Sequence, residues 1–309
     1  MAEKKTKVLI IGITGWLGNR IAHALLDQGF AAVSALVRPG ATTPEKSKKI
    51  TDLQARGLAT ATGDLTDPAS LAKACEGIEV VVSAVQGGAE VIIAGQRNLL
   101  AAAEGAGVKR MIPSVFSVDL PALDFKDNVN LDLRKTFDES FASSKVAPTS
   151  VYCGGFLDVI LSPRFPLLDW EKGTMSYWGD GNQPLDYTAV PDVASYTAAA
   201  VTDSGLTGKP LRVAGNSLTM KEKHRALETA SGRSLETRSL GSVEELRLLI
   251  DEKKRTATNP WDWISLQYTW CMVSGKGKLR DLDNARYPQF RPVSVESFVR
   301  RLLPNLPRG

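Results

Sequence analysis

Three glycines between an apolar run and an amphipathic segment are the most constraining feature of this sequence. Val8–Ile11 is continuously apolar, as expected of a parallel strand that is covered on both faces. Residues 16–28 carry apolar side chains three and four positions apart, which predicts a helix. Gly12, Gly15 and Gly18 occupy the turn between the two. The sequence therefore predicts a strand, a glycine loop and a helix in direct succession.

This glycine loop has the properties of a binding site for a dinucleotide pyrophosphate. Bare backbone N–H groups and the positive end of a helix dipole attract phosphate, and a side chain at Gly12 or Gly15 would obstruct its approach. Gly18 lets the helix and the strand pack closely. The alternative, a merely tight turn, is disfavoured by the flanking strand and helix. The expected contact residues are Gly12, Thr14, Gly15, Trp16, Leu17 and Gly18, with packing of Trp16 against the helix as an alternative role.

Strands and helices continue to alternate after this unit. We expect further strands at 32–37, 58–62, 80–85, 110–113 and 149–153, and helices at 68–76, 90–104 and 131–144. This alternation predicts a parallel sheet with helices on both faces, the doubly wound α/β (Rossmann) fold. We expect a nucleotide-binding domain over residues 1–155, to which residues 186–215 return, and a smaller substrate-binding region over 156–309.

The residue that ends the second expected strand points to NADP. NAD-binding proteins of this fold carry an acidic residue there, whereas this strand ends in Arg38 and no carboxylate follows before Glu45. An arginine fits a 2′-phosphate, and a hydrogen bond to a charged group is worth about 1.5–3 kcal/mol, which corresponds to about one to two decades in affinity. Lys46, Lys48 or Lys49 could add a second cation, or these lysines could belong to a solvated basic loop.

The ends of the third and fourth strands supply the other expected cofactor contacts. Asp64 could accept a hydrogen bond from the adenine amino group, and Leu65 could cover the ring. The small residues that end the fourth strand would let the ribose and nicotinamide lie over the sheet edge, where ligands of parallel sheets collect. The residues concerned are Ser83, Ala84, Val85 and Gln86. Either segment alone would be an ordinary turn.

Composition argues against several other classes. The 309 residues include 38 Lys and Arg against 34 Asp and Glu, without a dense basic run, so nucleic acid is not an expected partner. No apolar segment approaches the roughly 18 residues of a membrane helix, and we expect no membrane contact. The widely spaced Cys75, Cys153 and Cys271, with only two histidines, predict no metal site and fit the reducing cytoplasm.

Several motifs together resemble the NmrA-like and isoflavone-reductase-like branch of the atypical short-chain dehydrogenases. They are the glycine loop, Leu36-Val37-Arg38, Gly63-Asp64-Leu65 and Ser83-Ala84-Val85, followed by Arg110–Ser114 with Phe116, Gly154-Gly155-Phe156, Gly179–Asn182 and Asp192-Val193. The common Tyr-x-x-x-Lys motif is absent, because Leu131 stands four residues before Lys135. The resemblance implies an NADP-dependent reductase in which Lys135 assists proton transfer and Phe156 lies at the cofactor.

Two serines and one lysine are thus the candidate catalytic groups. Ser114 and Ser117 follow the fifth strand, where a hydroxyl could bind a substrate carbonyl oxygen, although a local turn role is the better prediction. Lys135 could equally be a solvent-exposed helix lysine beside Arg134.

We expect an NADPH-dependent reductase of a small aromatic or conjugated carbonyl-type substrate. The aromatic stretch Trp261, Trp263, Tyr268 and Trp270 suggests this substrate class, although such residues are more often core. The first alternative is an NmrA-like regulator that senses NADP(H) without catalysis and reports to a protein partner. The second is an epimerase or lyase that uses bound NADP without consuming it. The sequence allows an oligomer.

Overall fold

The chain folds into two compact units. The computed structural model describes residues 5–40, 43–162 and 165–305. Unit 1 comprises Met1–Phe116, Leu133–Val151 and Val193–Leu211, and unit 2 comprises Ser117–Asp132, Tyr152–Asp192 and Arg212–Gly309. Unit 1 is therefore discontinuous in sequence, and the segment that returns to it is 193–211.

A six-stranded parallel sheet with the strand order β3-β2-β1-β4-β5-β6 forms the centre of unit 1. Because β1 lies between β2 and β4, successive strands are added on one side of β1 up to β3 and on its other side from β4 onward. This change of side occurs beside the glycine loop. The doubly wound α/β fold predicted from the sequence is confirmed. The strands are β1 (Thr6–Ile11), β2 (Ala31–Val37), β3 (Ala59–Thr62), β4 (Val80–Ser83), β5 (Arg110–Ile112) and β6 (Ala147–Pro148).

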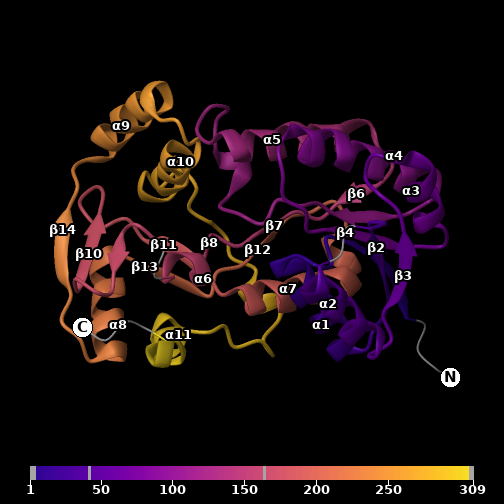
Figure 1. Ribbon diagram of the computed structural model, residues 1–309, viewed down its shortest axis with the longest axis horizontal. Helices are drawn as coiled ribbons and strands as arrows, with labels where there is room; N and C mark the ends of the chain where they lie inside the picture. The colour runs from indigo at the N-terminus through magenta and orange to yellow at the C-terminus, as the bar shows by residue number, and fades with distance from the viewer. Residues whose placement is uncertain (1–4, 41–42, 163–164, 306–309) are drawn as a thin grey trace. The chain divides into compact units, whose positions relative to one another are not determined.

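Helices cover both faces of this sheet (Figure 1). The helices α1 (Trp16–Gln28), α2 (Pro44–Gln54) and α7 (Val190–Thr202) lie on one side, and α3 (Pro68–Cys75), α4 (Gln96–Gly105) and α5 (Val129–Asp138) lie on the other. A π-helical turn, Glu90–Gly95, leads into α4. Leu9, Val81 and Met111 of the sheet pack with Leu99 and Phe137 of the helices in one buried core.

A buried arginine attaches the returning segment to the sheet. Arg110 is only 4% exposed, and its guanidinium donates hydrogen bonds to the carbonyl oxygens of Val201 and Asp203 at the end of α7. The hydroxyl of Thr149 donates to the carbonyl oxygen of Leu206 at 2.7 Å. These bonds fasten the end of α7 and the turn that follows it to β5 and to the end of β6.

Three local expectations differ from the structure. The strand predicted at 149–153 is found only in part, because β7 covers Val151–Tyr152 alone and pairs with β12 (Leu211–Arg212) in a separate two-stranded sheet, whereas the sixth strand of the parallel sheet, β6, ends at Pro148. The helix α2 was not predicted. The helix expected at 131–144 begins earlier, because the side chain of Asn128 accepts hydrogen bonds from two backbone N–H groups and so caps α5.

Unit 2 contains two small sheets and five complete α-helices among the described residues. One sheet has the order β13-β11-β8 and the other β14-β10-β9. Helix α8 packs on α11, and α9 packs on α10, which carries the aromatic stretch. The strands are β8 (Gly155–Phe156), β9 (Leu168–Asp169), β10 (Thr174–Tyr177), β11 (Leu185–Thr188), β13 (Asn216–Leu218) and β14 (Glu236–Ser239); the helices are α6 (Leu157–Ile160), α8 (Met220–Ser231), α9 (Val243–Thr256), α10 (Trp261–Val273) and α11 (Val295–Leu302).

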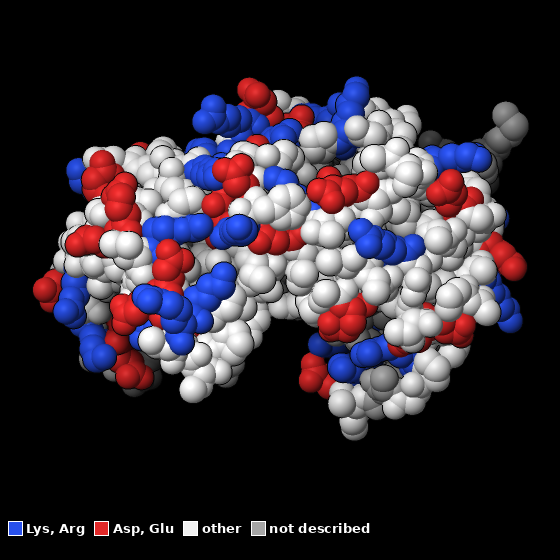
Figure 2. Space-filling view, turned by 90° about the horizontal axis from the view of Figure 1, so that it is seen from above, with Lys and Arg blue, Asp and Glu red and all other residues white. Residues whose placement is uncertain are grey.

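The surface and the cysteines add little specific chemistry. Figure 2 shows acidic and basic side chains interspersed on one face, without a continuous basic area. Cys75, Cys153 and Cys271 are buried and unpaired. Within the described ranges, no cluster of His, Cys, Asp or Glu could hold a metal ion. None of the helices seen there has the length and apolarity to cross a bilayer.

One lysine lies in the apolar core of unit 2. Lys223 is on the same face of α8 as Met220, Ala226 and Leu227, and it is 4% exposed. Its Nζ lies 5.4 Å from the centroid of the Tyr187 ring, and no carboxylate in the described part of the chain forms an ion pair with it. Burial lowers the pKa of Lys223 to about 8.

We predict that Lys223→Met stabilises the protein at neutral pH. The unfolded lysine has a pKa of 10.5, so between about 8 and 10.5 the unfolded state binds more protons and stability rises with pH. Below that window the buried charge costs the folded state about 3 kcal/mol, which the methionine variant does not bear. Thermal unfolding of the wild type and the variant, from neutral pH through this range, measures the difference in stability.

The exposed Lys221→Met on the same helix serves as the control, and it should leave stability unchanged. The difference in stability between wild type and Lys223→Met should shrink as the pH rises toward 10.5. A difference that stays constant would contradict the lowered pKa of Lys223.

Candidate functional site

The predicted cofactor residues of unit 1 gather at one edge of its sheet. The glycine loop follows β1, Arg38 follows β2, Asp64 follows β3, and Ala84 follows β4. Because these strands are parallel, their carboxyl ends lie at the same edge, where ligands of doubly wound sheets bind.

Backbone contacts between the glycine loop and β4 leave no room for side chains. Gly12 has a φ of +92°, and a Cβ there would lie 2.4 Å from the carbonyl oxygen of Ala84. A Cβ on Gly18 would lie 2.3 Å from the carbonyl oxygen of Gly12. The Gly15 N–H donates to that same carbonyl oxygen at 2.9 Å. The loop is therefore pressed against the end of β4 by contacts that only glycine permits.

The first turn of α1 has no side chain of its own to satisfy its N–H groups. Its N-cap is Gly15, without a side-chain hydrogen bond, and the turn holds no acidic residue. The neighbouring helices α2 and α3 are capped by the side chains of Thr43 and Asp67. The α1 terminus thus keeps donors and a positive dipole end that suit an external anion.

Arg38 and Asp64 are oppositely charged residues at the same edge of the sheet as this terminus. Arg38 is exposed. Hydrogen bonds from the backbone N–H of Thr66 at 2.9 Å and its hydroxyl at 2.7 Å lower the pKa of Asp64, and the charge of Arg38 adds to this. The ammonium of Lys49 lies 2.8 Å from the Glu45 carboxylate within α2. Arg38, which follows the end of β2, makes no such ion pair among the described residues.

The ends of β4 and β5 are linked by Ser114. Its hydroxyl donates to the carbonyl oxygen of Val85 at 2.6 Å, and its N–H donates to the side-chain oxygen of Gln96 at 3.1 Å. The proton of Ser114 is thus donated to a carbonyl on a neighbouring strand end, 29 residues away in sequence, and not within a local turn. Ser83 is fully buried, and its hydroxyl has no hydrogen-bond partner among the described residues.

Gln96 is a positioning residue that sequence reasoning missed. It is fully buried and also donates to the carbonyl oxygen of Ile92 at 2.9 Å. Its signal in the sequence was a glutamine on the apolar face of a helix that also presents Leu99 and Ala103.

Trp16 lies at the surface, whereas Leu65 packs against the core of unit 1. The ring of Trp16 is 43% exposed, with the Arg20 guanidinium 5.7 Å from its centroid, so Trp16 is not a core residue. Leu65 packs against the core of unit 1, and its carbonyl oxygen accepts a hydrogen bond from Asn98 at 2.9 Å. Thr14 and Leu17 are half-buried, and Gln86 is exposed.

The remaining candidates divide between the units. Lys135 is half-buried in the last turn of α5 and belongs to unit 1. Ser117 and Phe156 belong to unit 2. The Ser117 hydroxyl donates to the carbonyl oxygen of Val118 at 3.1 Å, and its carbonyl accepts from the N–H of Cys153 at 2.7 Å. Ser117 therefore has a local structural role.

Comparison with known proteins identifies the family of this chain. Residues 4–258 match the model of the NmrA-like family. The chain belongs to the NmrA-like family. Among its isoflavone-reductase-like relatives, isoflavone reductase homolog A622 of Nicotiana glauca is 30% identical over 84% of this chain and 85% of its own length. Eugenol synthase 1 of Petunia hybrida is 28% identical, covering 76% and 78%.

Solved structures share the fold of this NmrA-like protein. A crystal structure of isoflavone reductase superposes with a TM-score of 0.81 at 23% identity, covering 97% of this chain and all of the other. A structure described as AtPrR2 with NADP⁺ and (+)pinoresinol gives a TM-score of 0.84 at 23% identity, covering 96% and 99%.

We predict that Gly12→Ala destabilises the protein far more than Gly29→Ala. Both glycines have a positive φ, but a Cβ at Gly29 meets nothing within 4 Å, whereas one at Gly12 meets the Ala84 carbonyl. The backbone cost is about 1–2 kcal/mol at either site, and the clash adds about 1–3 kcal/mol at Gly12 alone. Denaturant unfolding measures both, and equal losses would contradict the close approach.

Proposed function

We propose that this protein is an NADPH-dependent reductase of a small aromatic or conjugated carbonyl-type substrate. The observation that carries the proposal is the uncapped α1 terminus, held against β4 by Gly12 and Gly18. Such a terminus binds a diphosphate through backbone donors and the helix dipole.

The residues present fit NADP. The α1 terminus would hold the pyrophosphate, and Arg38 would bind the 2′-phosphate. Asp64 would accept a hydrogen bond from the adenine amino group. The orphaned Ser83 hydroxyl, buried at the end of β4, is a donor that a ligand at this edge could use. When bound, NADPH supplies a hydride.

The chain itself must supply the proton and orient the substrate. Lys135 carries an ammonium group that can donate a proton to a carbonyl oxygen as negative charge develops there. The hydroxyl oxygen of Ser114 can still accept a hydrogen bond, although its proton is committed to Val85. We therefore assign proton donation to Lys135 and at most a positioning role to Ser114.

The substrate class is supported by the relatives and by α10. The relatives include proteins named eugenol synthase and phenylcoumaran benzylic ether reductase, and both names refer to aromatic compounds. In α10, Trp261 is 52% exposed, and Trp263, Tyr268 and Trp270 are half-buried, so none of them is a fully buried core residue. Consumption of NADPH with a panel of aromatic aldehydes, ketones and enones tests the proposal, and tight NADPH binding without turnover would defeat it.

That negative result would favour a second candidate function, a regulator that senses NADP(H) and binds a protein partner. The commitment of the Ser114 proton to the Val85 carbonyl and the leucine four residues before Lys135 are the features in its favour. A sensor of the cofactor ratio must distinguish the oxidised from the reduced form. Similar affinity for NADPH and NADP⁺ would therefore count against it.

We predict that Arg38→Gln weakens NADPH binding about 10- to 100-fold and leaves NADH binding nearly unchanged, because only NADPH carries the 2′-phosphate. Lys49→Gln should have a smaller effect, because the Lys49 ammonium already pairs with Glu45. Calorimetric titration of both cofactors into each variant measures this. An unchanged preference in Arg38→Gln would refute the role of Arg38.

We predict that Lys135→Met lowers kcat about 100-fold or more with little change in NADPH affinity, since proton transfer contributes about that much. Lys145→Met is the matched control, because Lys145 is an exposed lysine of the same unit. Steady-state kinetics on a turned-over substrate, together with cofactor titration, separates the two effects. Equal kcat in both variants would show that Lys135 is an ordinary helix lysine.

A further inference from the structure

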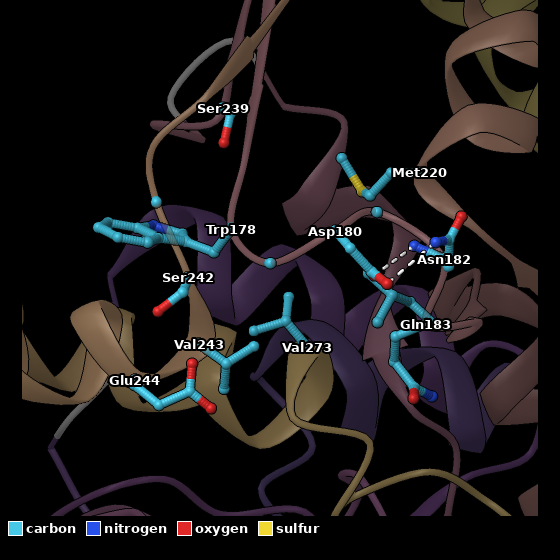
Figure 3. Close-up of a pocket in the computed structure, with 14 residues that line it drawn as sticks. Trp178, Asp180, Asn182, Gln183, Met220, Ser239, Ser242, Val243, Glu244 and Val273 are labelled. Atoms are coloured by element: carbon cyan, nitrogen blue, oxygen red, sulfur yellow. Dashed lines mark hydrogen bonds between the residues drawn. The ribbon is translucent and has the colours of Figure 1, made fainter.

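A pocket of about 830 Å³ lies entirely within unit 2, and the proposed reductase function does not use it (Figure 3). Two segments form most of it, residues 178–183 after β10 and residues 239–244, which run from the last residue of β14 into the first turn of α9. The Leu240 N–H donates to the Tyr177 carbonyl oxygen, and the Gly179 N–H donates to the Gly241 carbonyl oxygen, both at 2.8 Å. We call it the indole pocket, after Trp178. These backbone bonds hold its two sides together, so the pocket is preformed.

One wall of the indole pocket is apolar. Trp178 is 8% exposed and packs in a buried cluster with Leu246 and Ile250 of α9. A Cβ on Gly241 would lie 3.2 Å from the indole ring, which shows how closely this glycine approaches it. The other apolar lining residues are Leu185, Met220, Val243 and Val273. The volume and this wall suit a flat molecule of about the size of a drug fragment or larger.

The charged lining residues of the indole pocket are both acidic. They are Asp180 and Glu244, and none of the lining residues is Lys or Arg. The ammonium of Lys221, which does not line the pocket, donates to the side-chain oxygen of the lining residue Asn182 at 3.4 Å, and its charge helps to lower the pKa of Asp180. Figure 3 shows the loop with Asp180 and Asn182 on one side and the segment with Glu244 on the other.

Both carboxylates are charged at neutral pH. The backbone N–H and the side-chain amide of Asn182 donate to Asp180, each at 2.9 Å, and lower its pKa. Hydrogen bonds from its own N–H and from the Ser242 hydroxyl lower the pKa of Glu244. An anionic ligand would therefore meet two negative charges and no lining cation, whereas a cation would meet attraction from both sides.

We propose that the indole pocket binds a small aromatic amine in its protonated form. The aromatic ring lies against Trp178 and the neighbouring apolar side chains, and the ammonium group lies toward Asp180 and Glu244.

Three indole ligands of equal ring structure test this in the intact protein: tryptamine, the neutral tryptophol and the anionic indole-3-acetate. Calorimetric or ligand-observed NMR titration at neutral pH and low salt should give the order tryptamine, tryptophol, indole-3-acetate from tightest to weakest. Each exposed charge pair contributes up to about 5-fold, so tryptamine should bind at least a few-fold more tightly than tryptophol. Equal binding of all three, or no association of tryptamine up to about 10 mM, overturns the proposal.

Variants locate the site. Asp180→Asn and Glu244→Gln should each weaken tryptamine binding up to about 5-fold while leaving tryptophol unchanged. Ser239→Trp, at an exposed lining residue, should fill the pocket and abolish binding of all three ligands. Ser204→Trp, at an exposed serine of unit 1, is the matched control and should bind as wild type. Loss of tryptamine binding in this control, or its retention in Ser239→Trp, would place the ligand elsewhere.

NADPH titration of every variant keeps this proposal separate from the reductase proposal. None of the substituted residues belongs to the glycine loop, so NADPH binding should persist and show that each variant is folded. Tryptamine binding without NADPH turnover would leave this proposal intact and defeat only the other.

Discussion

The close approach of the glycine loop to the end of β4 is the constraint on which the proposed cofactor site depends. The N–H of Ala84 donates to the carbonyl oxygen of Ile11 at 2.9 Å, and the Ala84 carbonyl oxygen faces the bare α-carbon of Gly12. The Gly12 carbonyl oxygen in turn faces Gly18 on α1. Strand, loop and helix are thus stacked backbone against backbone. With no side chain in the stack, the donors at the α1 terminus stay open to an anion.

The sequence predicted this part well because its signals are local. Helix α1 has the predicted bounds, since apolar spacing and a terminal glycine define both ends. Helix α2 was missed because only Ile50 and Leu53 are buried in it, which is too few to show a period. Strand β6 was misplaced because it is two residues long and ends in proline, so its partner strand, rather than its own residues, defines it.

The site itself was predictable only where backbone chemistry decides it. Glycines and the position of Arg38 relative to a strand can be recognised from spacing alone. The roles of Ser114, Gln96 and Arg110 depend on partners far away in the chain, such as Val85 and the end of α7, and no local pattern announces those partners. A serine at a strand end looks the same in sequence whether its proton is available or already donated.

The two proposed sites show that the N-termini of two helices can favour ligands of opposite charge. At α1 the cap is a glycine and the first turn has no carboxylate, so the helix dipole is uncompensated and an anion is stabilised. At α9 a capping box of Ser242 and Glu245 satisfies the terminal N–H groups, and Glu244 adds a second negative charge. The carboxylates outweigh a dipole end equivalent to about half a charge, so the indole pocket beside α9 favours a cation. The capping residues, and not the presence of a helix terminus, therefore determine which ligand each site can hold.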